Sequence, residues 1–205
     1  YMPYFIHPDP SVERRSGFLI PTLGHSDEKG LIYGQPYFHV IDQARDIKIE
    51  PVIYTREGII LKSHYRHALP RGNLDIRTTT GALASGFTAT KTDDISLKGS
   101  VDLSAKFALD RTWRASFDLE QSSNRNYQRK FDLDTKEVLT SRALLEGFRS
   151  RNYTSLSTYK FQGLRSTDDR RKQPFVFPTL NYNFIGQANT YGIRPEIDLA
   201  ITSIT

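Results

Sequence analysis

The chain has 205 residues, a mean hydropathy of −0.50, and 28 basic against 23 acidic side chains, for a net charge of +5. This excess is small and dispersed, and no basic run is longer than Arg170-Arg171-Lys172, so nucleic-acid binding is not expected. Cysteine is absent, which excludes disulfides and thiolate metal sites within the chain.

The two ends of the chain read as parts of a longer protein. No apolar run approaches the roughly 18 residues that a membrane-spanning helix needs. Residues Tyr1–Phe5 lack the charged and apolar regions of a signal peptide. We therefore expect an internal piece that begins after a targeting segment and ends within a strand at Ile201–Thr205. Three prolines within residues 1–15 predict an extended connector from a preceding domain, so that the folded part is expected to span residues 16–205.

Two extended runs, residues 14–25 and 31–41, flank the short polar segment 26–30 and predict a hairpin. Each run has a proline near its middle, Pro21 in the first and Pro36 in the second. Proline has no N–H to donate to a neighbouring strand, so these strands are expected to form a weakly bonded pair. An ordinary sheet edge would tolerate the same prolines, and the spacing alone does not separate the two interpretations.

Apolar and polar side chains alternate through most of the remaining chain. The pattern is clearest at residues 100–109, where Val101, Leu103 and Phe107 share one face. A period of 2 predicts strands, and no segment shows the period of 3.6 that predicts a helix. The expected strands are 46–55, 59–66, 73–80, 100–109, 113–120, 141–148, 153–161, 174–184 and 192–205. Longer loops are expected at 81–95, which is rich in Gly, Ala, Ser and Thr, at the polar segment 121–140 and at the charged segment 165–173.

These patterns predict an all-β fold, an antiparallel up-and-down transmembrane β-barrel of which about ten or eleven strands are present. Strands of about 9–11 residues span a bilayer when they are tilted. Aromatic residues recur near strand ends, as in the interfacial girdles of membrane barrels. They are Tyr33, Tyr37, Tyr54, Tyr65, Trp113, Tyr153, Tyr159 and Tyr182. A soluble β-sandwich binding module is the alternative, because it also alternates, and it would stay monodisperse without detergent.

Several phrases of the sequence resemble one known family. The phrase RRSGFLIPTLG (14–24), followed by QPYFHVI (35–41) and DIKIEPVIYTREG (46–58), resembles the start of the barrel in the lipopolysaccharide-assembly, or organic-solvent-tolerance, family LptD. The later segments 110–134, 139–153 and 159–184 resemble further barrel strands and loops of the family in the same order. The similarity therefore touches most of the chain.

This resemblance implies a role and a location. Members are outer-membrane translocon components that insert lipopolysaccharide into the outer leaflet, so localisation in the cell outer membrane is expected. The implied partners are lipopolysaccharide, a plug lipoprotein inside the barrel, the periplasmic bridge components that deliver lipopolysaccharide, and outer-membrane lipids. Residues 16–205 would then be the N-terminal portion of a larger barrel, and residues 1–15 the connector from a periplasmic domain.

In the family, the seam between the first and last barrel strands is the lateral gate, and Pro21 and Pro36 match its positions. Missing donors lower the cost of opening, because each unsatisfied backbone group costs several kcal/mol in lipid. Gly17, Gly24 and Gly34 are expected to add local flexibility. The polar strand face is expected to line a hydrated lumen that passes a phosphorylated sugar core, with possible lipid contacts at Lys48, Lys62, Arg77, Lys106 and Arg114.

We expect no enzyme activity, cofactor or metal site. The sequence contains no nucleophile elbow, phosphate-binding loop or dinucleotide fingerprint. His64 and His67 are three residues apart, which places them on opposite faces of a strand, so a shared metal is not expected. A general porin-like barrel remains a rival function, and its conductance would stay large with the plug lipoprotein bound.

Overall fold

All strands of the described chain belong to one antiparallel sheet. The computed structural model describes residues 14–204, except 84–95, 124–126, 132, 134–135, 166–167 and 169–172. Its strands are β1 (Gly17–Phe18), β2 (Thr22–Ser26), β3 (Gly30–Gly34), β4 (Tyr37–Val40), β5 (Arg45–Tyr54), β6 (Gly58–Leu69), β7 (Gly72–Leu83), β8 (Ser96–Ala108), β9 (Trp113–Ser122), β10 (Val138–Arg149), β11 (Asn152–Gly163), β12 (Phe175–Ile185) and β13 (Glu196–Ile204), with one helical turn, α1 (Tyr127–Lys130), between β9 and β10. The expected connector and the loop after β7 fall largely on residues 1–13 and 84–95, which lie outside the described residues.

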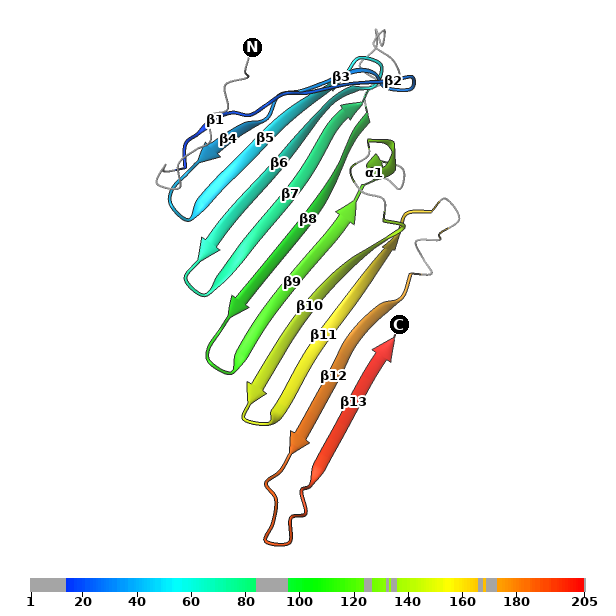
Figure 1. Ribbon diagram of the computed structural model, residues 1–205. Helices are drawn as coiled ribbons and strands as arrows, with labels where there is room; N and C mark the ends of the chain where they lie inside the picture. The colour runs from blue at the N-terminus through cyan, green and yellow to red at the C-terminus, as the bar shows by residue number, and fades with distance from the viewer. Residues whose placement is uncertain are drawn as a thin grey trace, which may run out of the picture.

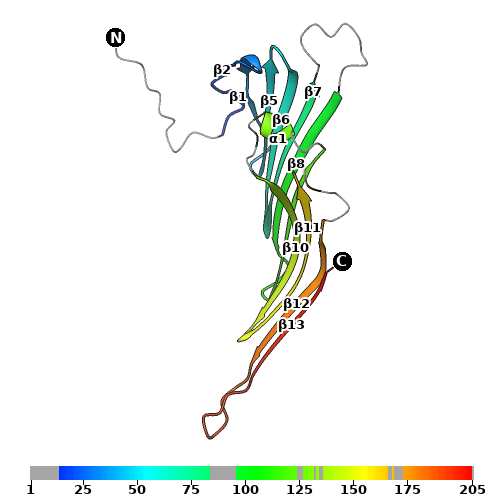
Figure 2. The ribbon, with the colours of Figure 1, turned by 90° about the vertical axis from the view of Figure 1, so that its right-hand side faces the viewer.

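The sheet has simple up-and-down order. From β5 to β13 every strand pairs with its sequence neighbour, and the full order is β1-β4-β5-β6-β7-β8-β9-β10-β11-β12-β13, with β2 paired to β3 and β3 to β5 (Figure 1). Seen from the side, this sheet is one curved layer (Figure 2). The described chain is thus an open, partial barrel. Because β1 and β2 are two halves of one strand, and β4 and β3 two halves of the next, the thirteen segments occupy eleven strand positions, and the prediction of an all-β fold with ten or eleven strands is confirmed. The β-sandwich alternative is wrong for this part of the chain, because no second sheet covers the first.

Alternation along the strands separates a polar face from an apolar face. Directly opposed residues share a face, so Asp46, Arg66, Asp75, Ser104 and Asp118 form one continuous polar row from β5 to β9. The apolar face carries large side chains that stay exposed across the sheet. They include Ile49 (36% exposed), Ile53 (40%), Ile59 (51%), Leu61 (42%), Phe117 (43%), Leu156 (43%), Leu199 (46%) and Ile201 (51%). So large an uncovered apolar surface is unfavourable in water and calls for an apolar medium or a partner.

The two ends of the sheet differ in their connections. At the short-turn end the chain reverses at residues 41–44, 70–71, 109–112 and 150–151, and through one longer connection at 186–195. At the long-loop end the β9–β10 connection spans residues 123–137 and the β11–β12 connection residues 164–174, whereas the β2–β3 and β5–β6 turns are short, at 27–29 and 55–57. In the 109–112 turn the backbone N–H groups of Trp113 and Thr112 donate to the Asp110 carboxylate, which lowers the pKa of that group. Short turns thus predominate at one end and long loops occur at the other, a pattern found in outer-membrane barrels.

Two details of the sequence interpretation were wrong. The 121–140 loop is not simply polar, because Tyr127 and Phe131 are 2% exposed and pack on the sheet. Tyr54, Tyr153 and Tyr159, expected in an aromatic girdle, lie on the polar face, and Tyr54 is 4% exposed beneath the loop. No helix in the described part of the chain is long and apolar enough to cross a bilayer.

Candidate functional site: an interrupted strand pair beside a polar face

The first two strands are each broken in the middle. β1 pairs with β4 through Gly17–Phe38 and Phe18–Tyr37, and β2 resumes the pairing with β3 at Thr22 opposite Gly34. Three residues, 19–21, separate the paired segments of the first strand, but only two, 35–36, separate those of the second. The first strand therefore contains one extra residue, which is the mark of a β-bulge.

The two prolines occupy this interruption but differ in their surroundings. Pro21 is exposed in the bulge, whereas Pro36 is buried. The N–H of Leu19 donates to the Pro36 carbonyl at 2.9 Å. In an antiparallel pair of this kind the opposite residue returns a second bond, which Pro36 cannot supply. The backbone pairing is thus interrupted where the sequence predicted a weakly bonded pair.

The three glycines expected to add flexibility have different environments. A Cβ added at Gly17 would meet nothing within 4 Å, and one at Gly24 would make ordinary contacts of 3.7 Å with Ile32. At Gly34 the added Cβ would lie 3.0 Å from Glu50 Oε1 and 3.4 Å from Val52 Cγ2. Gly34 therefore permits close approach of β3 to β5, so its role in packing is better supported than a role in flexibility.

The five basic residues expected in a lumen share the polar face. The register places Lys48 opposite His64, His64 opposite Arg77 and Lys62 opposite Thr79, and it puts Lys106 and Arg114 on the same face of β8 and β9. Their contact with lipid stays a prediction. Near the short-turn end the structure adds Arg71 and Arg142, which line one open depression together with Lys106 and Arg114. Arg142 was missed because only the strand register brings it there.

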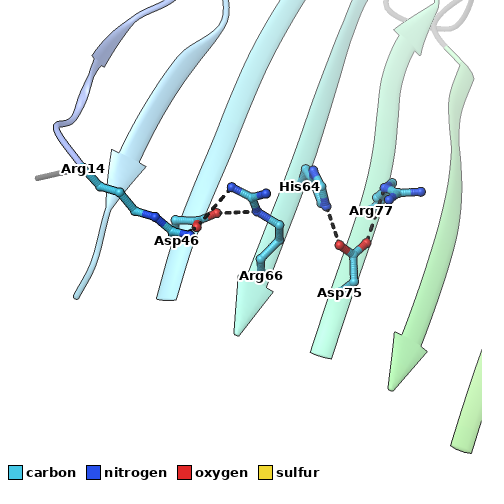
Figure 3. A network of polar contacts seen from close by, with 6 residues as sticks. All are labelled: Arg14, Asp46, His64, Arg66, Asp75 and Arg77. Carbon is cyan, nitrogen blue, oxygen red and sulfur yellow. Dashed lines mark hydrogen bonds and ion pairs between the residues drawn. The ribbon is translucent and has the colours of Figure 1, made fainter. Parts of the chain in front are cut away.

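A buried carboxylate connects the chain before β1 to the sheet. Asp46, with 4% of its side chain exposed, accepts from Arg14 Nη1 at 3.0 Å, from Arg66 Nε at 2.8 Å and from Arg66 Nη2 at 3.1 Å (Figure 3). Two strands further on, Asp75 lies 2.7 Å from His64 Nε2 and 3.3 Å from Arg77 Nε. His67 lies on the opposite face from His64, and the described residues contain no group of three or more potential ligands that could bind a metal.

The β9–β10 loop folds onto the polar face at the long-loop end. Phe131 packs edge-to-face on Tyr54, with ring centroids 5.0 Å apart, and Tyr127 lies 5.5 Å from Phe131. Val52 and Ile60 complete this loop cluster, and Ile32 of β3 packs against it. Burial raises the pKa of the Tyr127 hydroxyl. The cluster therefore joins the second strand to β5 and β6 beside the interruption.

Comparison with known proteins identifies the family. The family model described as LPS transport system D, LptD, matches residues 97–204, which is more than half of the chain. The chain belongs to the LptD family. This match, together with a relative that covers 99% of the chain, confirms the resemblance to the family.

Individual LptD proteins match different lengths of the chain, and all of those described here are named LPS-assembly protein LptD. The protein of Francisella tularensis subsp. tularensis is 26% identical over 204 residues, which is 99% of this chain and 21% of the relative. That of Pseudoalteromonas atlantica is 30% identical over 62% of this chain and 16% of the relative. That of Acidovorax sp. JS42 is 43% identical over 30% of this chain and 8% of the relative. The chain therefore spans about a fifth or less of the length of these relatives.

Proposed function

We propose that this LptD chain forms the gate side of an outer-membrane translocon that inserts lipopolysaccharide into the outer leaflet. The observation that carries the proposal is the interruption of the first two strands, where Pro36 faces Leu19 and the first strand has an extra residue. The sheet opens laterally at its first strand, between the first and last strands of the complete barrel. Residues 1–15 connect this barrel portion to a periplasmic domain.

The cost of opening depends on the backbone bonds that must break. In lipid each unpaired backbone group costs several kcal/mol, so a continuous strand would resist separation along its whole length. Here the β1–β4 pairing comprises only two residue pairs, and the bulge and Pro36 separate it from the β2–β3 pairing. Each half of the first strand can therefore bend away from the second strand independently, so that the first strand leaves the last strand in two steps, at a lower cost for each step.

The two faces of the sheet suit the lipid and the aqueous environments that this role requires. The exposed apolar face matches the acyl region of the outer membrane, and the polar face provides a hydrated path. Arg71, Lys106, Arg114 and Arg142 at the short-turn end offer cations to a phosphorylated sugar core. The plug lipoprotein would occupy the space in front of the polar face, and periplasmic bridge components would deliver lipopolysaccharide from the short-turn side.

Replacing Pro21 and Pro36 together with alanine should slow the arrival of lipopolysaccharide at the cell surface. A free N–H at position 36 can donate to the Leu19 carbonyl, and each added bond contributes about 0.5–1.5 kcal/mol net, or roughly a 2- to 10-fold change in the opening equilibrium. Pulse-labelled lipopolysaccharide, followed by its accessibility at the surface of intact cells, measures the rate.

Pro70→Ala provides a matched control, because Pro70 lies in the turn between β6 and β7, away from the first strands. This control variant should transport at the normal rate. An unchanged rate in the double variant, with the protein assembled normally, would contradict the gate. Large conductance in the presence of the plug lipoprotein would favour a porin-like function instead.

A further inference from the structure

The Leu19–Pro36 pair lacks one of its two backbone hydrogen bonds, and a side chain supplies a bond in its place. Leu19 donates to the Pro36 carbonyl, but the Leu19 carbonyl receives no backbone donor from Pro36, because proline has no N–H. The side-chain amide of Gln35 lies in this place and donates from Nε2 to the Leu19 carbonyl at 2.9 Å. A side chain of the second strand thus supplies the bond that its backbone lacks.

The orientation of this amide is fixed from its other end. The Tyr33 hydroxyl donates to Gln35 Oε1 at 3.0 Å, and Gln35 Nε2 also lies 3.4 Å from the Pro36 carbonyl. Tyr33, Gln35 and Tyr37 lie on the same face of the second strand, the apolar face. A polar amide on that face is costly unless it is bonded, so its bond to Leu19 accounts for its presence there.

A third proline, Pro51 of β5, removes a backbone hydrogen bond from Gln35 on the side away from the first strand. The backbone N–H of Gln35 donates to the Pro51 carbonyl at 3.2 Å. Pro51 has no N–H to return to the Gln35 carbonyl. At residues 35–36 the second strand is therefore held by one backbone bond toward Leu19 and by one toward Pro51, and the Gln35 amide adds a further bond toward the first strand.

We propose that Gln35 is a positioning residue that acts as a releasable latch between the first two strands; this inference rests on the proposed lateral opening. A backbone N–H can leave its acceptor only if the strand moves. A glutamine amide leaves by side-chain rotation, which takes picoseconds to nanoseconds for accessible side chains and needs no movement of the strand. In the closed state the Gln35 amide is hydrogen-bonded to the Leu19 carbonyl, and it releases this carbonyl before the first strand moves away.

The test is a double-mutant cycle in the full-length protein, assembled with its partners in lipid vesicles. Nitroxide labels at positions 25 in β2 and 59 in β6, both on the apolar face, report the distance between the first strand and β6 by pulsed electron paramagnetic resonance. Gln35→Leu should raise the population with a long distance about 3- to 10-fold, as expected for the loss of one hydrogen bond. In the Pro36→Ala background, where the backbone again supplies a donor, the same Gln35→Leu change should have less than about a twofold effect.

Two further variants separate the latch from a general loss of stability. Tyr33→Phe keeps the ring but removes the hydroxyl that orients the amide, so it should raise the open population by a smaller factor. Gln162→Leu removes a comparable side-chain amide far from the first strands. Gln162 Nε2 donates to the Ser122 carbonyl at 2.7 Å, and Gln162 Oε1 accepts from the Ser122 N–H at 3.1 Å. Gln162→Leu should leave the open population unchanged.

The outcomes distinguish the latch from the proposed function. An equal effect of Gln35→Leu in both proline backgrounds, or no effect in either, overturns the latch. If the Gln35→Leu protein fails to assemble, an unchanged open population in Tyr33→Phe overturns the latch. The expected cycle combined with unchanged lipopolysaccharide arrival supports the latch and contradicts the export role.

Discussion

Replacing Phe131 with alanine should release the β9–β10 loop from the polar face. Phe131 is 2% exposed and contacts the rings of both Tyr54 and Tyr127. Removing a buried phenyl ring costs about 3–5 kcal/mol, because transfer energy is lost and a cavity remains. The rings of Phe131, Tyr54 and Tyr127 form the apolar contact between the helical turn and the sheet, so much of this loss should appear as local opening of the turn.

Hydrogen–deuterium exchange of the full-length protein provides the measurement. The amides of Phe131 and Leu133, which donate to the Tyr127 and Gln128 carbonyls at 3.3 and 2.9 Å, should exchange faster by a factor of about 100 or more. Exchange should also rise around Ile32, whose side chain packs on the same cluster. Tyr191→Ala is the control, since Tyr191 is 87% exposed in the β12–β13 connection. Protection that survives in Phe131→Ala would show that the loop is held by other contacts.

The loop also illustrates what the sequence can and cannot predict. Strands β5 to β13 were predicted to within a few residues at most ends, because alternation is a local pattern. The inward fold of the loop was missed because its composition is polar. Tyr127 and Phe131 are four residues apart, which places them on one side of a helical turn. That spacing was the available signal.

Long-range pairing explains the other omissions. Pro21 and Pro36 could be found as donors missing from extended runs, but the Gln35 amide gains meaning only when Leu19 lies opposite Pro36. Asp46 likewise meets Arg14 across 32 residues of sequence. Such contacts depend on register, and the extra residue in the first strand shifts the register by one in a way that the alternation does not reveal.

Replacing Asp46 with asparagine should detach the start of the first strand. The Asp46 carboxylate is nearly inaccessible and accepts three hydrogen bonds from two arginines, one of which, Arg14, lies just before β1. Asparagine is isosteric but carries no charge, and its amide nitrogen cannot accept from a guanidinium. Hydrogen bonds to charged groups contribute about 1.5–3 kcal/mol, although the half-exposed arginines can recover part of this from water.

The effect should be concentrated at β1, because its pairing with β4 involves only two residue pairs. We expect a nitroxide label at position 15 to become mobile in Asp46→Asn and the distribution of distances between β1 and β5 to broaden. Arg14→Gln should reproduce this result, since it removes the same tether from the other side. Asp75→Asn is the matched control, because Asp75 belongs to the same polar row and binds His64 and Arg77 but does not contact the first strand. If Asp46→Asn and Asp75→Asn have equal effects on β1, Asp46 serves only the general charge balance of the polar face, and the entry of the chain into the sheet is fixed by β1 itself.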